Sequence, residues 1–551
     1  MSAPTTSIIP LFIIFYNKHF EPNLPPFYYF LQQFIGLVLY IGKLRVYGED
    51  MIAKTYSVIP FGYNGAIIEI EGTEVCGLPA FNIVGMASKT ISEARERVKS
   101  AIRSSGFIFP DQKLTINLAP ADLEKSGTGL DLPIAINILT LSNQLLQNNI
   151  AGTAFVGELS LDGEIRPIHG IINIAESAKN AGFKRLVIPY KNFTQASLVS
   201  GIEIIPIKTL MDVYLYLKNQ LKISLTSNVV KNTATDEIAV TFADIYGQDL
   251  AKRALLIAIA GRHNIILSGP PGTGKTALSK CALQYLPPLT LPEQISVTKI
   301  YSLSGRSSDI ITKRPFRSPH HTCSLVSLIG GGTQAMPGEI SLAHLGVLFL
   351  DELLEYPRPL LESLRQPLED RKISISRSGR KITYPADFML IATTNPCPCG
   401  FLGDPNHPCT CSESQIRNYR KKLSGPLLDR IDIHTEVGRV DPSVVATKRS
   451  NRSDALLDMT NAISKAITIQ RQRYNNNHTY NASAPSAQIS NLMHIHPKAK
   501  ILLNSAAKSL DLSMRAYFKV IKVAQTIADL SGEPEINTSH ISEAIAFRQK
   551  T

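Results

Sequence analysis

The chain has 551 residues, of which 44% are hydrophobic and 19% are charged. This balance is typical of a folded globular protein, and the length corresponds to about three domains of roughly 100–200 residues each. Both values argue against a single small domain and against a chain without an apolar core. The net charge of +12 at pH 7 is a mild excess that suits a polyanionic partner such as nucleic acid.

Seven cysteines are present, and four of them crowd into residues 397–411. The odd number, the length of the chain and the lack of a recognisable cleavable signal peptide argue against a framework of disulfide bonds. We therefore expect a reducing, cytoplasmic location.

The first fifty residues form an apolar N-terminal extension with two interpretations. Residues 22–42 hold no charged side chain, but a transmembrane helix needs about 20 apolar residues. The apolar run here is shorter, contains Gln32 and Gln33, and follows three prolines. We expect no stable membrane association, with a weak anchor as the alternative, and we expect translation to begin at Met51.

Residues 51–221 mix strand and helix patterns and predict an α+β domain. Strands are expected where apolar and polar residues alternate or a short apolar run occurs, at residues 65–71, 113–118 and 186–189. Helices are expected where apolar residues recur at helical spacing, at residues 88–104, 132–145 and 171–181. Residues 155–161, followed by Asp162 and Gly163, predict a hairpin.

Three further segments follow this domain. Residues 222–240 are rich in Ser, Thr and Asn and predict a linker. Over residues 241–442 strands alternate with helices, which is the pattern of a doubly wound parallel sheet. Residues 443–551 are expected to be helical.

A complete phosphate-binding loop lies inside the second domain, composed of Gly269, Pro270, Pro271, Gly272, Thr273, Gly274, Lys275 and Thr276. A buried strand at residues 265–267 precedes it and a helix begins near Lys275, which is the strand–loop–helix context that the pattern requires. In such loops backbone N–H groups face the phosphates of ATP, the lysine reaches the outer phosphates, and the Thr276 hydroxyl is a ligand of Mg²⁺.

Two further strand ends predict ATP hydrolysis. Residues 347–350 are apolar and are followed by Asp351, which can hold the Mg²⁺ shell, and Glu352, which can polarise a water. Residues 390–394 predict another strand, and Asn395 at its end can orient the attacking water. Alone, Asn395 would be a simple strand-end cap; its order in the series favours a catalytic role.

The order of these motifs, followed by Arg430 in Leu-Leu-Asp-Arg and Arg515 in Ser-Met-Arg, resembles the magnesium-chelatase branch of the AAA+ ATPases. From Met51 onward the chain resembles the ComM (YifB) subfamily. The resemblance implies that Arg430 is an arginine finger acting on ATP held by the neighbouring subunit, and that Arg515 is the second sensor in a helical lid. It also implies an ATP-dependent homo-hexamer. Outside this context, Arg430 beside Asp429 and Asp432 would be a surface salt bridge.

The segment 314–322 also matches the subfamily and lies where this branch inserts loops that face the ring pore. Its basic and aromatic side chains can grip a phosphate backbone and stack on bases. We therefore expect DNA binding at Arg314, Arg317, His320 and His321. The alternative is that the two histidines are structural or interface residues.

Two close pairs of cysteines follow Asn395 in the chain, at Cys397, Cys399, Cys409 and Cys411. Two such pairs are typical of a four-thiolate Zn²⁺ site, although the usual spacing within a pair is about two to four residues and here it is one. A metal there would brace the loop after the strand that ends at Asn395. Reduced thiols or a redox pair are the alternatives, and His407 is a substitute ligand.

Residues 155–189 resemble the proteolytic domain of Lon, which implies a Lon-like fold for the first domain. Lon-type proteases use a Ser nucleophile and a Lys base, and on the same pattern these positions fall at Gly129 and Ile172. Neither side chain can act as a nucleophile or a base, so we expect a domain without peptidase activity. The alternative is an unusual dyad drawn from Lys125, Ser126 and Thr128.

The predicted fold class is therefore α/β, with an N-terminal Lon-like α+β domain, an AAA+ doubly wound parallel-sheet core carrying a Cys-rich insert, and a C-terminal helical lid. The ComM resemblance implies a hexameric helicase that drives branch migration on single-stranded or branched DNA during natural transformation. A chelatase-like motor subunit, an ATP-dependent protease and a regulatory ATP switch without turnover are the alternatives. The chain shows no metal-dependent adhesion domain, which argues against a chelatase-like motor subunit. Gly129 and Ile172 argue against an ATP-dependent protease.

Overall fold

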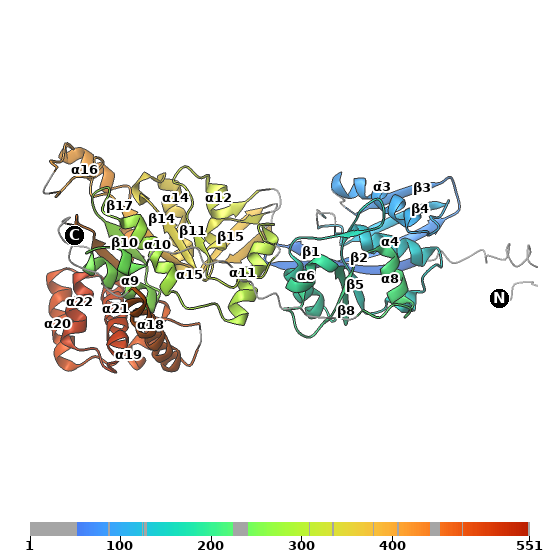
Figure 1. Ribbon diagram of the computed structural model, residues 1–551. Helices are drawn as coiled ribbons and strands as arrows, with labels where there is room; N and C mark the ends of the chain where they lie inside the picture. The colour runs from blue at the N-terminus through green and yellow to red at the C-terminus, as the bar shows by residue number, and fades with distance from the viewer. Residues whose placement is uncertain are drawn as a thin grey trace, which may run out of the picture.

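The computed structural model describes residues 52–85, 89–123, 125, 129–223, 241–307, 309–332, 335–377, 380–404, 407–440, 452–476 and 478–548. The expectations for residues 1–50 and for most of the linker lie outside this part of the chain. Figure 1 shows two blocks, an N-terminal domain in blue and teal and a larger block that runs from green to red. Among the described residues, no helix has the length and apolar composition needed to cross a bilayer.

A mixed seven-stranded sheet of order β3-β4-β2-β1-β5-β8-β9 forms the N-terminal domain. Strand β2 is antiparallel to both of its neighbours, and the other pairs are parallel. The strands are β1 (Ile52–Phe61), β2 (Asn64–Val75), β3 (Ala80–Val84), β4 (Lys113–Ala119), β5 (Thr153–Phe155), β8 (Arg185–Pro189) and β9 (Glu203–Ile207). The main helices are α3 (Lys89–Ser104), α4 (Asp131–Leu141), α6 (Ile171–Asn180) and α8 (Leu210–Leu217).

The expected strands and helices of this domain correspond to β2, β4, β8, α3, α4 and α6, with ends displaced by a few residues. The expected hairpin is formed by β6 (Glu158–Leu159) and β7 (Ile165–Arg166). The other strands of the sheet, β1, β3, β5 and β9, were not predicted, and neither was helix α8. Strand β3 is only half-buried and lies at the edge of the sheet, so its sequence carries little apolar alternation.

Helix α4 lies wholly inside the domain, since every one of its residues is buried. Its amide side chain Asn137 donates hydrogen bonds to the carbonyls of Ala53 in β1 and Ile70 in β2, at 2.9 and 3.0 Å. A Cβ atom at Gly72 would lie 2.0 Å from the Asn137 Oδ1 atom, so the strand passes this close only because that residue is glycine. A buried amide bonded in this way fixes the helix on the sheet.

A parallel five-stranded sheet of order β11-β14-β17-β10-β18 forms the second domain, which confirms the predicted parallel-sheet core. Its strands are β10 (Ile265–Ser268), β11 (Phe316–Arg317), β14 (Val347–Leu350), β17 (Met389–Thr394) and β18 (Ile433–Glu436). Strands β14 and β17 are buried along their whole length. Helix α9 (Asp249–Gly261) precedes β10, and α10 (Lys275–Tyr285) follows it.

The C-terminal part is helical, and its helices pack against α9 of the second domain (Figure 1). Its helices are α18 (Arg452–Tyr474), α19 (Ser486–Leu492), α20 (Pro497–Ser509), α21 (Met514–Ser531) and α22 (Thr538–Ala546). One apolar cluster contains Ile265 and Leu267 of β10 together with Ile467 of α18 and Val520 of α21. The helical part and the parallel sheet therefore share a core.

The two blocks meet where α6 contacts α11 (Leu291–Leu303). The Gly170 N–H donates to the carbonyl and the hydroxyl of Ser302, at 3.2 and 3.0 Å. The hydroxyls of Tyr63 and Ser296 lie 2.9 Å apart, and Lys299 is paired with Glu176 at 2.5 Å. A helix of the parallel-sheet domain is thus bonded directly to the N-terminal domain.

Several elements of the second domain were not individually predicted, among them a hairpin and two short surface helices. A hairpin of β15 (Lys372–Arg377) and β16 (Arg380–Pro385) follows α15 (Arg365–Asp370). Two short helices, α12 (Leu325–Ile329) and α16 (Glu413–Arg420), lie on the surface. Figure 1 shows α16 standing away from the sheet at the end of the larger block.

Candidate active site

The phosphate loop joins β10 to α10, so its residues lie at the carboxyl edge of the parallel sheet. Gly272 and Gly274 have φ angles of +78° and +85°, which L side chains rarely adopt. A Cβ atom at Gly269 would lie 2.1 Å from the Val437 carbonyl oxygen. The glycines therefore satisfy a backbone requirement, and the loop takes the shape that turns N–H groups toward a phosphate.

The ammonium group of Lys275 lies inside this loop. Its Nζ atom donates to the carbonyls of Gly269 and Pro270 at 2.5 and 2.8 Å, and to Asn395 Oδ1 at 3.1 Å. Burial lowers the pKa of Lys275, and the nearby carboxylates of Asp351 and Glu352 oppose that shift. The structure thus brings Lys275 and Asn395, which are 120 residues apart, into direct contact.

Thr276 and Asp351 meet beside the lysine. The Thr276 hydroxyl donates to Asp351 Oδ2 at 3.0 Å. An octahedral Mg²⁺ with metal–oxygen distances of about 2.0–2.1 Å places neighbouring ligand oxygens about 2.9 Å apart. A hydroxyl and a carboxylate at this separation fit the coordination of that ion or of its inner waters, as the sequence predicts.

Glu352 directly follows Asp351 and is held by its backbone. Its φ angle is +50°, in the left-handed region that non-glycine residues rarely occupy. The Glu352 N–H donates to the Thr393 hydroxyl at 2.9 Å, and that hydroxyl donates to Asp351 Oδ1 at 2.5 Å. Thr393 therefore fixes both acidic residues, while the Glu352 side chain stays exposed. A strained backbone that aims an acidic side chain into an open site is typical of catalytic positions.

Arg430 lies at the opposite edge of the sheet. Its carbonyl accepts a hydrogen bond from Asn264 at 3.0 Å, and Asn264 directly precedes β10, whereas Gly269 directly follows it. The four residues of β10 span about 13 Å. The arginine is therefore separated from the phosphate loop of its own chain by the length of a strand.

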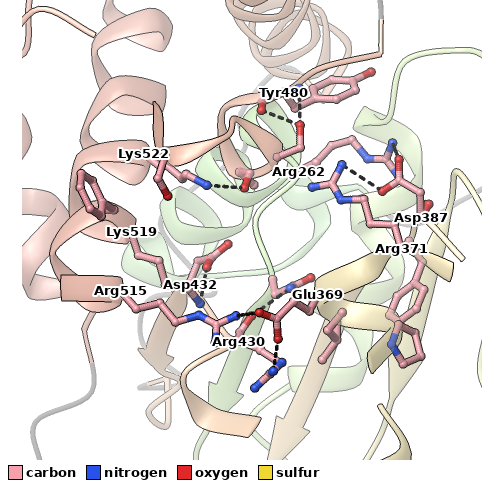
Figure 2. A pocket seen from close by; sticks show the side chains of 18 residues that line it. Arg262, Glu369, Arg371, Asp387, Arg430, Asp432, Tyr480, Arg515, Lys519 and Lys522 are labelled. Atoms are coloured by element: carbon pink, nitrogen blue, oxygen red, sulfur yellow. Dashed lines mark hydrogen bonds and ion pairs between the residues drawn. The ribbon is translucent and has the colours of Figure 1, made fainter. Parts of the chain in front are cut away.

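Arg515 of α21 joins Arg430 at this edge. Figure 2 shows the Glu369 carboxylate between the two guanidinium groups. One carboxylate oxygen pairs with Arg430 and the other with Arg515, the latter at 3.1 Å. The structure thus brings the two predicted arginines together, and no contact among the described residues joins either of them to Lys275 or Asp351.

The arginines line a cavity of about 510 Å³ (Figure 2). Six basic side chains contribute to its wall, namely Arg262, Arg371, Arg430, Arg515, Lys519 and Lys522. Three carboxylates face them, each bonded to two cationic or ring groups, namely Glu369, Asp387 and Asp432. The wall carries an excess of three positive charges and is suited to an anion of high charge.

Burial and neighbouring charges shift the pKa values of ionisable groups in this cavity wall. Burial alone would raise the pKa of Asp432, but the Lys519 ammonium and the His263 ring hold that pKa well below its ordinary value. Burial lowers the pKa of Lys522 to about 8, and the neighbouring Arg371, Lys519 and Arg515 contribute in the same direction. The charged form of such a lysine is stabilised when an anion binds nearby.

The histidine-containing segment before β14 divides into a buried part and an exposed part. Arg314 is 4% exposed, forms a bidentate pair with Glu293 at 3.1 and 3.2 Å, and donates to two backbone carbonyls. Arg317 forms a bidentate pair with Glu339 at 2.6 and 2.9 Å. The expectation that Arg314 contacts DNA is corrected, because its guanidinium group is buried and fully occupied inside the protein.

His320 is exposed, whereas His321 is half-buried, with its ring centroid 6.3 Å from that of Tyr356. The ring centroids of the two histidines lie 4.1 Å apart, and His320 Nδ1 lies 2.8 Å from the Thr322 hydroxyl. Helix α12 continues this surface with Leu325 and Val326, which are 44% and 56% exposed. The segment offers aromatic and apolar side chains to a partner rather than a row of free cations.

The four cysteines of the insert form one cluster, in which all four sulfur atoms lie within 4.8 Å of one another. Cys397 Sγ lies 3.4 Å from Cys399 Sγ and 3.7 Å from Cys409 Sγ, and the last two are 3.6 Å apart. A tetrahedral Zn²⁺ with Zn–S bonds of about 2.3 Å places its ligands about 3.8 Å apart. The donor set and its spacing fit that ion, whereas the His407 ring packs against Phe401 instead.

Three family models match the chain: magnesium chelatase, subunit ChlI, over residues 241–445; subunit ChlI of Mg-chelatase over residues 70–192; and its ChlI C-terminal model over residues 456–548. The chain is 41% identical over 503 residues to the competence protein ComM of Haemophilus influenzae, across 90% of this chain and 97% of that protein. It is 38% identical over 504 residues to the uncharacterized protein YifB of Salmonella typhimurium, with the same two shares covered.

The chain belongs to the ComM (YifB) family of magnesium-chelatase-like AAA+ ATPases. This confirms the resemblance found in the sequence. A partial similarity extends to Lon protease 2 of Bacillus subtilis, at 31% identity over 185 residues that cover 30% of this chain and 33% of that protein.

The Lon-like domain carries no described nucleophile–base pair at the two predicted positions. Ile172 is fully buried in an apolar cluster, and Gly129 offers no side chain. Lys125 is buried, and its Nζ atom donates to the carbonyls of Gly85 and Pro120. Ser126 and Thr128 lie outside the described residues, so the alternative dyad stays a hypothesis.

Sequence reasoning missed three residues of this site. Thr393 carries the one available signal, since it is the first of two threonines that end an otherwise apolar strand directly before Asn395. Glu369 and Lys522 carry none, because an acid on a short helix and a lysine on an amphipathic helix are ordinary surface patterns. Only the fold brings these last two to the cavity that holds Arg430.

Proposed function

We propose that this protein is an ATP-hydrolysing motor that works in the cytoplasm as a homo-hexameric ring on single-stranded or branched DNA. In this proposal it is a helicase that promotes branch migration during recombination in natural transformation. The observation that carries the ring is the separation of the site into two edges. The phosphate loop lies at one edge of the sheet, and Arg430 and Arg515 lie at the other, so a complete site needs two chains.

The residues around the phosphate loop would divide the steps of ATP binding and hydrolysis among them. Thr276 and Asp351 would hold Mg²⁺, which neutralises phosphate charge when bound. Lys275 would exchange its carbonyl partners for the outer phosphates. Glu352 would polarise the attacking water, and Asn395, bonded to Lys275, would orient it.

The arginines would complete the site from the neighbouring chain. Arg430 and Arg515 would stabilise the charge that develops on the transferred phosphoryl group, which is the role of an arginine finger. The positive cavity around them supports this, because its excess charge is compensated when phosphates of the adjacent chain enter it.

Three observations support DNA as the substrate of the motor. The chain carries a net charge of +12, the rings of the exposed His320 and the half-buried His321 lie side by side, and a relative that matches along almost its whole length is named a competence protein. Stacking of bases on aromatic rings is tolerant of sequence, as a translocating ring requires. Arg317, which is one quarter exposed, can contribute from beside this pair.

The cysteine cluster is proposed as a structural Zn²⁺ site. Cys397, Cys399, Cys409 and Cys411 supply four sulfur donors at tetrahedral spacing, and a closed four-thiolate site is the usual form of structural zinc.

A subunit-mixing experiment tests the shared site. E352Q would bind ATP without hydrolysing it and keeps its arginines, whereas R430A keeps a complete phosphate loop. Each variant alone should be inactive, but an equal mixture should regain turnover, because about a quarter of the interfaces in a closed ring join an intact loop to an intact arginine. A mixture as inactive as its components would sink the shared site.

The DNA substrate is tested separately by ATP turnover with and without single-stranded and branched DNA. The proposal expects turnover to rise with DNA and branched substrates to be unwound. ATP turnover that ignores both DNAs, with no unwinding, would leave an ATPase of another kind, and a chelatase-like motor would then be the first alternative.

A further inference from the structure

The loop of the cysteine cluster touches the phosphate loop. Gly400, which lies between Cys399 and Cys409, has a φ angle of +85°. A Cβ atom built on it would lie 2.7 Å from Pro271 Cδ and 3.3 Å from Pro271 Cγ. The Gly400 backbone therefore packs against the Pro271 ring with no space for a methyl group.

The cluster fixes the backbone that makes this contact. The Gly400 N–H donates to the Cys397 carbonyl at 3.0 Å, and the Cys399 N–H lies 3.3 Å from Cys411 Sγ. Cys397 is fully buried and stands two residues after Asn395, which contacts Lys275. A metal ion bound by the four sulfur atoms would thus hold Gly400 in place against the phosphate loop.

We propose that the metal-loaded cysteine cluster is the brace of the phosphate loop, so that metal occupancy sets the affinity for ATP. The inference rests on the proposed ATP site and zinc site and adds their coupling. The Pro271 ring packs against Gly400. With the metal removed, the cysteine loop gains conformational freedom, and Pro271 loses the contact that supports it. ATP binding must then also order the phosphate loop, which weakens the affinity.

Two glycines of the same loop provide a matched pair of variants. Gly400 and Gly403 have φ angles of +85° and +81°, so alanine strains both backbones equally, but nothing lies within 4 Å of a Cβ at Gly403. In the full-length protein, G400A should weaken binding of a fluorescent ATP analogue about tenfold, the effect expected of overpacking. G403A should bind like the wild type. Metal content, measured by elemental analysis, should stay at one zinc per chain in both variants. Equal affinities in the two variants would overturn the brace.

A compensating substitution guards against a misfolded G400A. In G400A/P271A the ring atoms Cγ and Cδ of Pro271 are gone, and the next nearest atom to the new methyl group is the residue 271 nitrogen at 3.9 Å. Affinity should then recover at least in part. A double variant that binds no better than G400A would show that the loss has another origin, and would count against the contact.

Metal removal tests the other half of the coupling. Chelation of the wild type should weaken ATP binding about as much as G400A does, zinc should restore it, and chelation of G400A should add little, because both changes act on one contact. Wild-type protein that binds ATP equally well with and without metal would overturn this inference alone. Wild-type protein that binds no ATP in either state would overturn the proposed function with it.

Discussion

Arg314 provides the sharpest test of how this site is built, because the sequence and the structure assign it different roles. Its guanidinium group and the Glu293 carboxylate are 4% and 3% exposed. The arginine also donates to the carbonyls of Pro287 and Leu345, at 2.7 Å each. Removing one partner of a buried ion pair costs about 3–5 kcal/mol, since the other charge is left without compensation. The R314A substitution should therefore destabilise the parallel-sheet core by about 3 kcal/mol.

The measurement is a thermal unfolding scan of the full chain. For a domain of this size, about 3 kcal/mol corresponds to a decrease in Tm of roughly 10 °C. R358A is the matched control, because Arg358 is exposed at the start of a helix and its loss should change Tm by less than about 2 °C. An apolar pair, E293L/R314M, should recover much of the loss. If R314A unfolded at the wild-type temperature but bound DNA more weakly, Arg314 would be a DNA contact and the structural role would be refuted.

Three further outcomes are expected. T393V removes the hydroxyl that holds Asp351 and the Glu352 backbone, so kcat should fall about 10–100-fold with ATP affinity nearly unchanged; an unchanged kcat would contradict this positioning. K275A should lose binding of a fluorescent ATP analogue and, with it, ATP-dependent assembly in a sizing column; hexamers formed without nucleotide binding would count against that dependence. The pKa of Lys522 is about 8 when folded and 10.5 ordinarily, so the unfolded chain binds more protons between these values and stability rises with pH across that window. In denaturant titrations, K522M should abolish this rise of stability with pH and should stabilise the protein by about 1–3 kcal/mol at pH 7. A pH dependence of stability that K522M leaves unchanged would show that Lys522 is solvated.

The sequence predicted which residues meet at the edge of the sheet that holds the phosphate loop, because each of them follows an apolar strand. Strands β14 and β17 are continuous apolar runs that end in polar residues, and carboxyl ends of parallel strands share one edge. The predicted Lys275, Thr276, Asp351 and Asn395 therefore meet as a consequence of sheet geometry.

The opposite edge could not be predicted in the same way. Glu369, on a helix of six residues, reaches Arg430 and Arg515 across 61 and 146 positions of the chain, and no periodicity records such a pairing. Arg314 was misassigned because burial decides the role of an arginine, and its partner Glu293 lies on a helix 21 residues earlier. The hairpin of β15 and β16 was missed although Ile373 and Ile375 alternate with polar residues in β15.

The shared apolar core of the parallel sheet and the helical lid constrains where movement can occur. Close-packed interiors transmit displacement and resist continuous deformation. Because β10 and α21 contribute to one apolar cluster, we expect them to move as one rigid unit. A lid hinged on its own core would open and close around nucleotide within one chain. Here Arg515 and the phosphate loop would instead move together, and in the proposed ring a movement driven by nucleotide would be taken up at the contacts between neighbouring chains.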